Sequence, residues 1–382
     1  PCLTAAAIAS AVASDGRADA VDPNFKLPTV IRANFGFTHN TDFGGAMGGF
    51  FDDWTAQIDL LYTRGRNSVD FVDVSLDQIA SSIDGRPIYT RIDRRLNPGC
   101  AAVPTGDLRD PFTGSPTGCA TVLNQASEDT IILTNALEGN KAFTVSGAFT
   151  KEFEFDSPLL SKPASLNVNM GYAYTTAEDS NPATSSVSTS NYRSVSSAYI
   201  NHNPLQTSNY ETRHNITANF TYTEEFFKDL DTKFSFFFQA RSGQPFSLTF
   251  NNTGAISWAP NLAYTYHLAN AGGPIGTGNG TGQTFSLTFN NTGAFGDTSS
   301  GGGSQRELLY IPTGPTDPNV TFGGGFNQAA FFALLDRVGA MKYAGQIAPR
   351  NVFTSGWFVD ADFRFQQDLP SILGIRPQMY VD

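Results

Sequence analysis

The residues that most often carry chemistry are sparse in this chain of 382 residues and do not fall at catalytic spacings. None of the 4 histidines has a second His, Cys or Glu at metal-ligand spacing, so the sequence predicts no metal and no cofactor. There is also no nucleophile-elbow pattern and no phosphate-binding loop, because the glycine runs lie outside any strand–turn–helix context. We therefore expect a protein that is not an enzyme.

The best candidates for chemistry are charged side chains that alternate along two predicted strands. Asp360, Asp362 and Arg364 share the polar face of one strand, and Lys233 and Arg241 share that of the other. Two carboxylates so close could act as a general acid and a general base. Each strand has an aromatic opposite face, however, which favours charges that point into the interior of a membrane barrel. We expect these five side chains to face water, a plug domain or a transport path.

The composition points away from an ordinary soluble protein. Charged residues make up 15% of the chain and aromatic residues 13%, with 32 Phe and 13 Tyr, whereas about a quarter of a soluble domain is charged. The mean hydropathy of -0.21 argues against membrane-spanning helices, as does the lack of a long apolar run. Neither criterion excludes a membrane β-barrel, because half of its strand residues face water. With a net charge of -11 and no Lys/Arg cluster, the chain is not expected to bind nucleic acid.

Alternation of apolar and polar residues is the strongest pattern in the sequence. In 165–174, Leu166 and Val168 share one face, and Asn167 and Asn169 share the other. Such alternation predicts strands with one face in water, and lengths of about ten residues suit strands that cross a bilayer at a tilt. Similar segments occur at 29–38, 54–63, 141–151, 214–223, 232–241 and 357–366. The side chains expected on a lipid-facing, exposed outside are Leu166, Val168, Ile216, Phe220, Phe234, Phe236 and Phe238.

The predicted fold class is all-β: a transmembrane antiparallel β-barrel, to which residues 1–382 contribute about eight membrane strands. The strands are expected at 27–38, 54–72, 130–151, 163–177, 211–223, 232–250, 353–367 and 374–382. The short turns alternate with long polar connections, which we expect to be extracellular loops gathered at one rim: 73–129, 178–210 and 251–352. An open sheet edge cannot sit in lipid, so further strands are expected outside this sequence.

Two segments within the long connections have patterns of their own. The Ser-rich stretch 184–198 is expected to be a solvated loop. The stretch 327–342 fits a short helix that packs on the barrel mouth, with binding of a partner as the alternative. The stretch 243–255 recurs at 282–294, differing only where Pro245 is replaced by Thr284. A local duplication that extended an exposed hairpin explains this repeat; a carbohydrate- or partner-binding role is the open alternative.

Two of the 3 cysteines, Cys100 and Cys119, bracket a stretch rich in Pro, Gly and Thr. This spacing favours a loop disulfide formed in an oxidising compartment, with two free thiols as the alternative. The remaining Cys2 would find its partner upstream of this sequence.

Three segments resemble the barrels of TonB-dependent receptors. PNFKLPTVIRANFGFTHN (23–40) and DDWTAQIDLLYTRGRNSVDFVDVSL (52–76) are similar to the middle of such a barrel. ARSGQPFSLTF (240–250) resembles a strand and loop start of the Oar-like subfamily. The most specific likeness is YAGQIAPRNVFTSGWFVDADFRFQQDLP (343–370), which is similar to the stretch before the last strands.

The resemblance implies a 22-stranded barrel in the outer membrane of a Gram-negative bacterium, with its own plug domain and with TonB as a partner. The expected function is energy-coupled uptake of a ligand captured by the extracellular loops. The expected partners are outer-membrane lipid and lipopolysaccharide, an unknown extracellular ligand, and a surface lipoprotein or other outer-membrane protein. The alternatives are a structural or adhesive surface barrel that transports nothing, and a passive porin-like channel.

Overall fold

One long antiparallel sheet dominates the structure, and the predicted all-β class is confirmed. The sheet has nine strands, eight of which follow one path in the order β2-β3-β9-β10-β12-β13-β23-β24, while β11 pairs with β10 beside it. Their bounds are β2 Thr29–Asn40, β3 Thr55–Arg66, β9 Lys141–Asp156, β10 Pro163–Asp179, β11 Gln206–Thr207, β12 His214–Phe227, β13 Leu230–Arg241, β23 Phe358–Asp368 and β24 Gln378–Val381. The computed structural model describes residues 18–45, 49–73, 76–81, 84–85, 87–91, 103–104, 130–157, 160, 162–193, 195–199, 201–251, 264–267, 283–289, 294–295, 307–322, 327–371 and 374–382.

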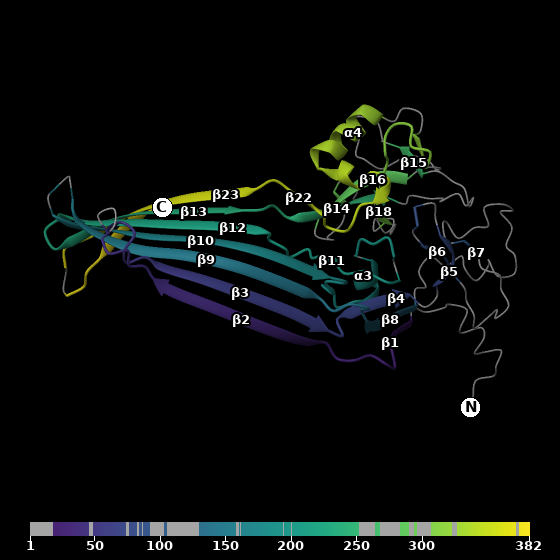
Figure 1. The fold of residues 1–382 in the computed structure, drawn as a ribbon, viewed down its shortest axis with the longest axis horizontal. Helices are drawn as coiled ribbons and strands as arrows, with labels where there is room; N and C mark the ends of the chain where they lie inside the picture. The colour runs from purple at the N-terminus through teal and green to yellow at the C-terminus, as the bar shows by residue number, and fades with distance from the viewer. Residues whose placement is uncertain are drawn as a thin grey trace.

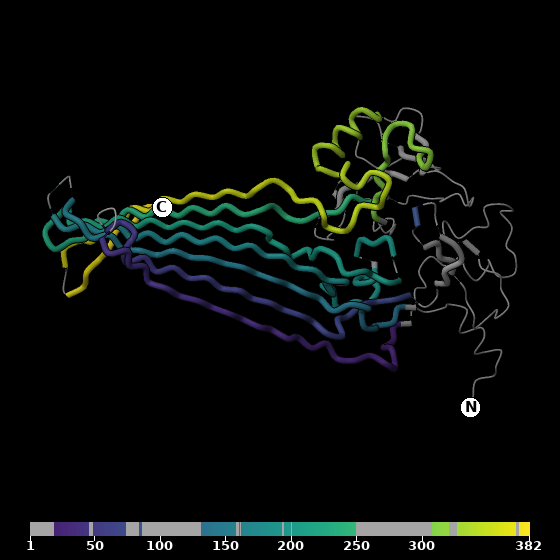
Figure 2. The backbone as a smooth tube through the Cα atoms, in the orientation of Figure 1, coloured from purple at the N-terminus to yellow at the C-terminus, as the bar shows by residue number. Residues whose placement is uncertain are grey.

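The sheet is a single curved layer, as the ribbon and the backbone tube both show (Figure 1, Figure 2). Its short turns gather at one end, which we call the turn end. The smaller strands and the helices gather at the opposite end, which we call the rim. Residues directly opposite each other in an antiparallel pair have their side chains on the same face of the sheet. The pairing is regular across these strands, so each face can be followed residue by residue from one strand to the next.

Five predicted strands are longer than the observed ones, in most cases because the chain bends where it leaves the sheet. After β3, Asn67 adopts a φ of 53°, a left-handed conformation that Asn tolerates, and the chain continues as β4 (Val69–Asp73). β8 (Thr130–Asn135) is separated from β9 by a turn. Beyond β13, a Cβ atom on Gly243 would lie 2.3 Å from the carbonyl oxygen of Ser355, so the crossing requires glycine. The predictions affected are 54–72, 130–151 and 232–250. In addition, 353–367 is divided into Phe353–Thr354 and Phe358–Asp368, and 374–382 is reduced to β24.

The hydrophobic clusters of the described residues both lie at the rim, beyond the long strands. One consists of Phe71 on β4, Ile131 on β8 and Tyr192 on α3 (Ser188–Arg193). It overturns the prediction that 184–198 is solvated, because Tyr192, Val195 and Ala198 are all buried. The apolar side chains among the serines draw this segment against β4 and β8.

The other cluster surrounds α4 (Gln328–Arg337), which confirms the predicted short helix. The helix begins at Asn327, whose side chain accepts a hydrogen bond from the backbone N–H of Ala330. Phe331 and Leu335 are buried against strands that continue from the sheet. Among the described residues, no helix is both long and apolar enough to cross a membrane.

The two copies of the sequence repeat form adjacent antiparallel strands, β14 (Pro245–Asn251) and β16 (Gln283–Phe289). Their register places Leu248 opposite Leu287, and Phe246 opposite Phe289. The remaining short elements are β1 Ala18–Val21, β5 Leu76–Ser81, β6 Pro87–Arg91, β7 Val103–Pro104, β15 Tyr264–His267, β17 Ala294–Phe295, β18 Glu307–Leu308, β19 Tyr310–Ile311, β20 Val320–Phe322, η2 Ala340–Tyr343, β21 Gln346–Ile347 and β22 Phe353–Thr354.

Candidate functional site

The five charged side chains selected from the sequence lie on one face of two adjacent strands. They are Lys233 and Arg241 on β13, and Asp360, Asp362 and Arg364 on β23. Arg364 Nη2 donates a hydrogen bond to Asp382 Oδ2 at 2.9 Å, and the Arg241 guanidinium lies 4.8 Å from the centroid of the Phe358 ring. Within the described residues no hydrogen bond or ion pair joins Asp360 to Asp362. The five side chains therefore form a charged face across two adjacent strands.

The rest of this face, which we call the polar face, is mostly uncharged and rich in Asn, Thr and Ser. Thr221 Oγ1 lies 3.2 Å from Ser235 Oγ on the neighbouring strand, and Gln239 Nε2 donates to Asn215 Oδ1 at 3.4 Å. Such cross-strand pairs leave other donors and acceptors directed away from the sheet. A face of this kind is suited to contact with water or with a polar partner.

The opposite face, which we call the apolar face, consists mainly of aromatic and aliphatic side chains. Phe236 is 40% exposed and Phe363 is 55% exposed, and the buried clusters of the described residues lie elsewhere. Of the seven side chains predicted to be exposed here, Ile216 and Phe236 are exposed and Val168 is buried at 6%. The other four are half-buried: Leu166, Phe220, Phe234 and Phe238. Val168 lies directly opposite Lys151 on one side and Phe220 on the other, and these long side chains cover it.

Ionisable residues on the apolar face lie near the strand ends. On β9, Lys141 and Lys151 are ten positions apart, and the side chains between them on this face are Phe143, Val145, Gly147 and Phe149. On β12, His214 and Glu224 are ten positions apart, with Ile216, Ala218, Phe220 and Tyr222 between them. Both strands therefore present an uncharged band of the same length.

An aromatic cluster around Lys151 lies at the turn end of the apolar face. Lys151 Nζ donates to the carbonyl oxygens of Gly49, Phe50 and Asp52 at 3.0, 3.1 and 2.6 Å. The same ammonium lies 4.5 Å from the centroid of the Phe153 ring, and Trp54 stands edge-on to that ring. Lys151 is only 8% exposed, so its charge holds the β2–β3 turn and is withdrawn from the surface.

A second aromatic cluster lies on the apolar face near the rim. The His214 ring stacks on Trp357 with centroids 5.8 Å apart, and lies 5.3 Å from that of Tyr174. His214 Nδ1 and the Tyr172 hydroxyl are 2.9 Å apart, within hydrogen-bond distance. The uncharged band thus has rings with polar edges at both ends.

Hydrogen bonds at the rim join long connections that are distant in sequence. The guanidinium of Arg350, which is 1% exposed, donates to the carbonyl oxygen of Ser180 at 3.0 Å and to Asp179 Oδ1 at 2.7 Å. Burial lowers the pKa of Arg350, and the nearby carboxylates of Asp179 and Asp70 oppose that shift. Sequence analysis did not select Arg350, although it lies within the Pro-Arg-Asn of the segment with the most specific family likeness.

Asp70 on β4 is the acidic centre of the same network. It is 3% exposed, and its Oδ1 accepts a hydrogen bond from Asn203 Nδ2 at 2.8 Å. Burial raises the pKa of Asp70, and the hydrogen bonds from Asn203, Phe71 and Asn181 oppose this only in part. The network ties the second long connection to the strand that follows β3.

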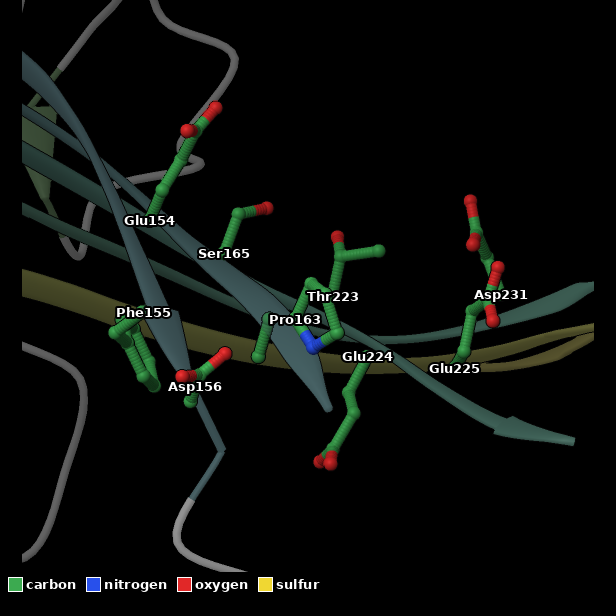
Figure 3. A pocket seen from close by; sticks show the side chains of 10 residues that line it. Glu154, Phe155, Asp156, Pro163, Ser165, Thr223, Glu224, Glu225 and Asp231 are labelled. Carbon is green, nitrogen blue, oxygen red and sulfur yellow. The ribbon is translucent and has the colours of Figure 1, made fainter. Parts of the chain in front are cut away.

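A hollow of about 670 Å³ lies at the turn end of the sheet (Figure 3). Glu154, Ser165 and Thr223 lie on one side of the strands, whereas Glu224 and Phe155 lie on the other. In the described part of the chain, no three His, Cys, Asp or Glu side chains form a group that could hold a metal.

The described parts of all three predicted long connections, 73–129, 178–210 and 251–352, leave the sheet at the rim (Figure 1). Cys2, Cys100 and Cys119 lie outside the described residues, and with them the predicted disulfide. Comparisons of the chain with models of protein families, with curated proteins and with solved structures give no match.

Proposed function

We propose that this chain forms part of the wall of a bacterial outer-membrane β-barrel, of the 22-stranded kind found in TonB-dependent receptors of the Oar-like type. Its long connections would capture a ligand at the cell surface. A plug domain and TonB would then supply the energy-coupled passage through the barrel. The polar face would line the interior, where Lys233, Arg241, Asp360, Asp362 and Arg364 meet the plug or the transport path.

The observation that carries this proposal is the uncharged band between Lys141 and Lys151 and between His214 and Glu224. Ten positions of strand, at about 3.3 Å each, span roughly 33 Å along the strand. A tilt of about 40° reduces this to about 25 Å, the height of the apolar band of an outer-membrane barrel. Charged side chains near the centre of such a band cost about 2–4 kcal/mol each, and this band has none.

The two aromatic clusters support the same orientation. Trp and Tyr rings prefer the membrane interface, where the ring is in an apolar setting and the polar edge is near water. Trp54 lies at one end of the band, and Trp357 and Tyr172 lie at the other. The two ends of the long strands would therefore lie in the two headgroup regions of the bilayer.

The rim supports the receptor role because binding usually resides in loops held by a rigid scaffold. Arg350 and Asp179 hold two long connections together above the sheet. A ligand-capturing surface requires loops in a fixed arrangement, and this buried ion pair supplies such a restraint.

Two adjacent phenylalanines provide the test of the membrane proposal. Phe236 lies on the apolar face and Phe237 on the polar face, and they are 40% and 37% exposed. Each would be changed to Cys in a cysteine-free background and spin-labelled in phosphatidylcholine vesicles. The label at 236 should be more accessible to oxygen, and the label at 237 to a water-soluble nickel complex. Equal accessibility to the nickel complex at both positions would refute the membrane wall.

Removal of TonB from the cell distinguishes a receptor from a passive channel and from an adhesive barrel. A receptor should bind its ligand at the surface without TonB but fail to take it up. A passive channel would continue uptake, and an adhesive barrel would show binding without uptake in either strain.

A further inference from the structure

The apolar face is not equally charged at its two ends. At the rim end it has Arg64 and Arg66 on β3 and Lys141 on β9, and Arg64 lies directly opposite Lys141. The turn end has Lys151, which is 8% exposed and bound to three carbonyl oxygens, and Glu224, which is 1% exposed. Accessible positive charge on this face is therefore concentrated at the rim.

The three cations, which we call the basic corner, are only partly neutralised by the protein. Lys141 Nζ lies 2.8 Å from Glu178 Oε2, in a pair whose side chains are 42% and 39% exposed. Arg64 and Arg66 are exposed, and within the described residues neither forms an ion pair. A partly exposed pair such as Lys141–Glu178 contributes little to stability.

Apolar rows follow the basic corner toward the middle of the sheet. Tyr62 lies directly opposite Phe143, and the two are 41% and 39% exposed. The next pair on the apolar face, one step further from the rim, is Leu60 and Val145. Cations followed by aromatic and then aliphatic side chains match the order of groups in an acidic lipid, from its headgroup to its chains.

We propose that the basic corner is a binding site for a phosphate-bearing membrane lipid of the outer leaflet, of the lipid A type. Arg64 and Arg66 would bind the phosphate oxygens through their planar, forked donors, and Lys141 would add a point charge. Tyr62 and Phe143 would contact the first segments of the acyl chains. This inference rests on the proposed function, because it places the apolar face in a bilayer with the rim outward.

The test uses the full chain in a non-ionic detergent, titrated with diphosphorylated lipid A and followed by native mass spectrometry. The triple variant R64Q/R66Q/K141Q should bind lipid A at least roughly tenfold more weakly, since charge-assisted contacts contribute more than neutral hydrogen bonds. The matched control is R32Q/K228Q/R376Q, which loses three exposed cations from the polar face and the turn end. The control should bind lipid A as the unaltered protein does.

A second arm separates this inference from the proposed function. The unaltered protein and both variants should insert equally into vesicles of phosphatidylcholine, as judged by flotation. If all three float but bind lipid A equally, the basic corner is not the site and the membrane wall stands. If the unaltered protein fails to float, both proposals are wrong.

Discussion

Arg350 and Asp179, which are 171 positions apart, form an ion pair of 2.7 Å in the interior of the rim. Arg350 lies near the end of the third long connection and Asp179 ends β10, so one buried contact joins two loops that are distant in sequence. The side chains are 1% and 8% exposed. Water therefore cannot replace either partner easily.

Replacement of Arg350 by Met should destabilise the rim and leave the sheet intact. Removal of one partner of a buried pair leaves an uncompensated charge, at a cost of about 3–5 kcal/mol. Hydrogen exchange should show faster exchange at Ser180 and Gln206, with unchanged protection in β12 and β13. The control Arg337→Met alters an exposed residue of α4 and should change neither region. A uniform loss of protection in the long strands would contradict the assignment to the rim.

The Asp70 carboxyl should make the rim more stable in mild acid than at neutral pH. Its pKa is raised from the ordinary 3.8 by burial, so the folded rim favours the protonated form. The contribution of Asp70 is present below that ordinary value and is lost as the pH rises through the raised one. Hydrogen exchange at Phe71 and Asn203, corrected for the intrinsic rate, should show this trend. Asp70→Asn should abolish it, and greater protection at higher pH would refute the prediction.

Asp317 should produce the opposite pH dependence beside α4. Burial raises its pKa, but the backbone N–H groups of Thr313 and Asn319, at 2.7 and 2.8 Å, outweigh this, and the net pKa is lowered from 3.8. The stabilisation is present above 3.8 and is lost as the pH falls through the lowered pKa. Asp317→Asn at neutral pH should reproduce the acid state, with a loss of about 1–3 kcal/mol. Amide hydrogen exchange at Thr313 and Asn319 measures both the pH dependence and the loss in the variant. The control is Asp336→Asn, on the exposed face of α4.

Lys151 should be required for the β2–β3 turn to stay closed. Lys151→Met retains the length of the side chain but removes the donor to three carbonyl oxygens, at an expected cost of about 2–3 kcal/mol. In a gel that separates folded from heat-unfolded protein, the variant should unfold at a lower temperature. Lys228→Met, in the exposed turn after β12, should not change that temperature. Equal unfolding temperatures for the unaltered protein and both variants would show that the hydrogen bonds from Lys151 to the three carbonyl oxygens are dispensable.

Deletion of 256–281 should leave the long sheet assembled. The described part of this segment is β15, whose partners β16 and β20 both lie outside the nine-stranded sheet. Ligand or partner binding should weaken, because the third long connection is shortened. A deleted chain that no longer reaches the folded form in the same gel would mean that the segment is structural.

The faces of the sheet could be predicted from the sequence because alternation is local: Phe236 and Phe238 share a face wherever the strand lies. The strand ends could not, since the bend at Gly243 depends on contact with Ser355, which is distant in sequence. The buried rim was missed for a similar reason. A polar segment is read as solvated, and only the folded structure supplies Asp179 as the partner of Arg350.

The repeat strands β14 and β16 have a property that extends beyond their place at the rim. The segment Phe246–Phe250 has the order Phe-Ser-Leu-Thr-Phe, which reads almost the same in both directions. In antiparallel pairing, such a segment places Phe opposite Phe and Leu opposite Leu when it meets its own copy, as β14 and β16 do. A duplicated copy therefore needs no new complementary surface, because its parent strand already provides one. By this route the surface loops of a protein can lengthen through copying, without any change in the strands that support them.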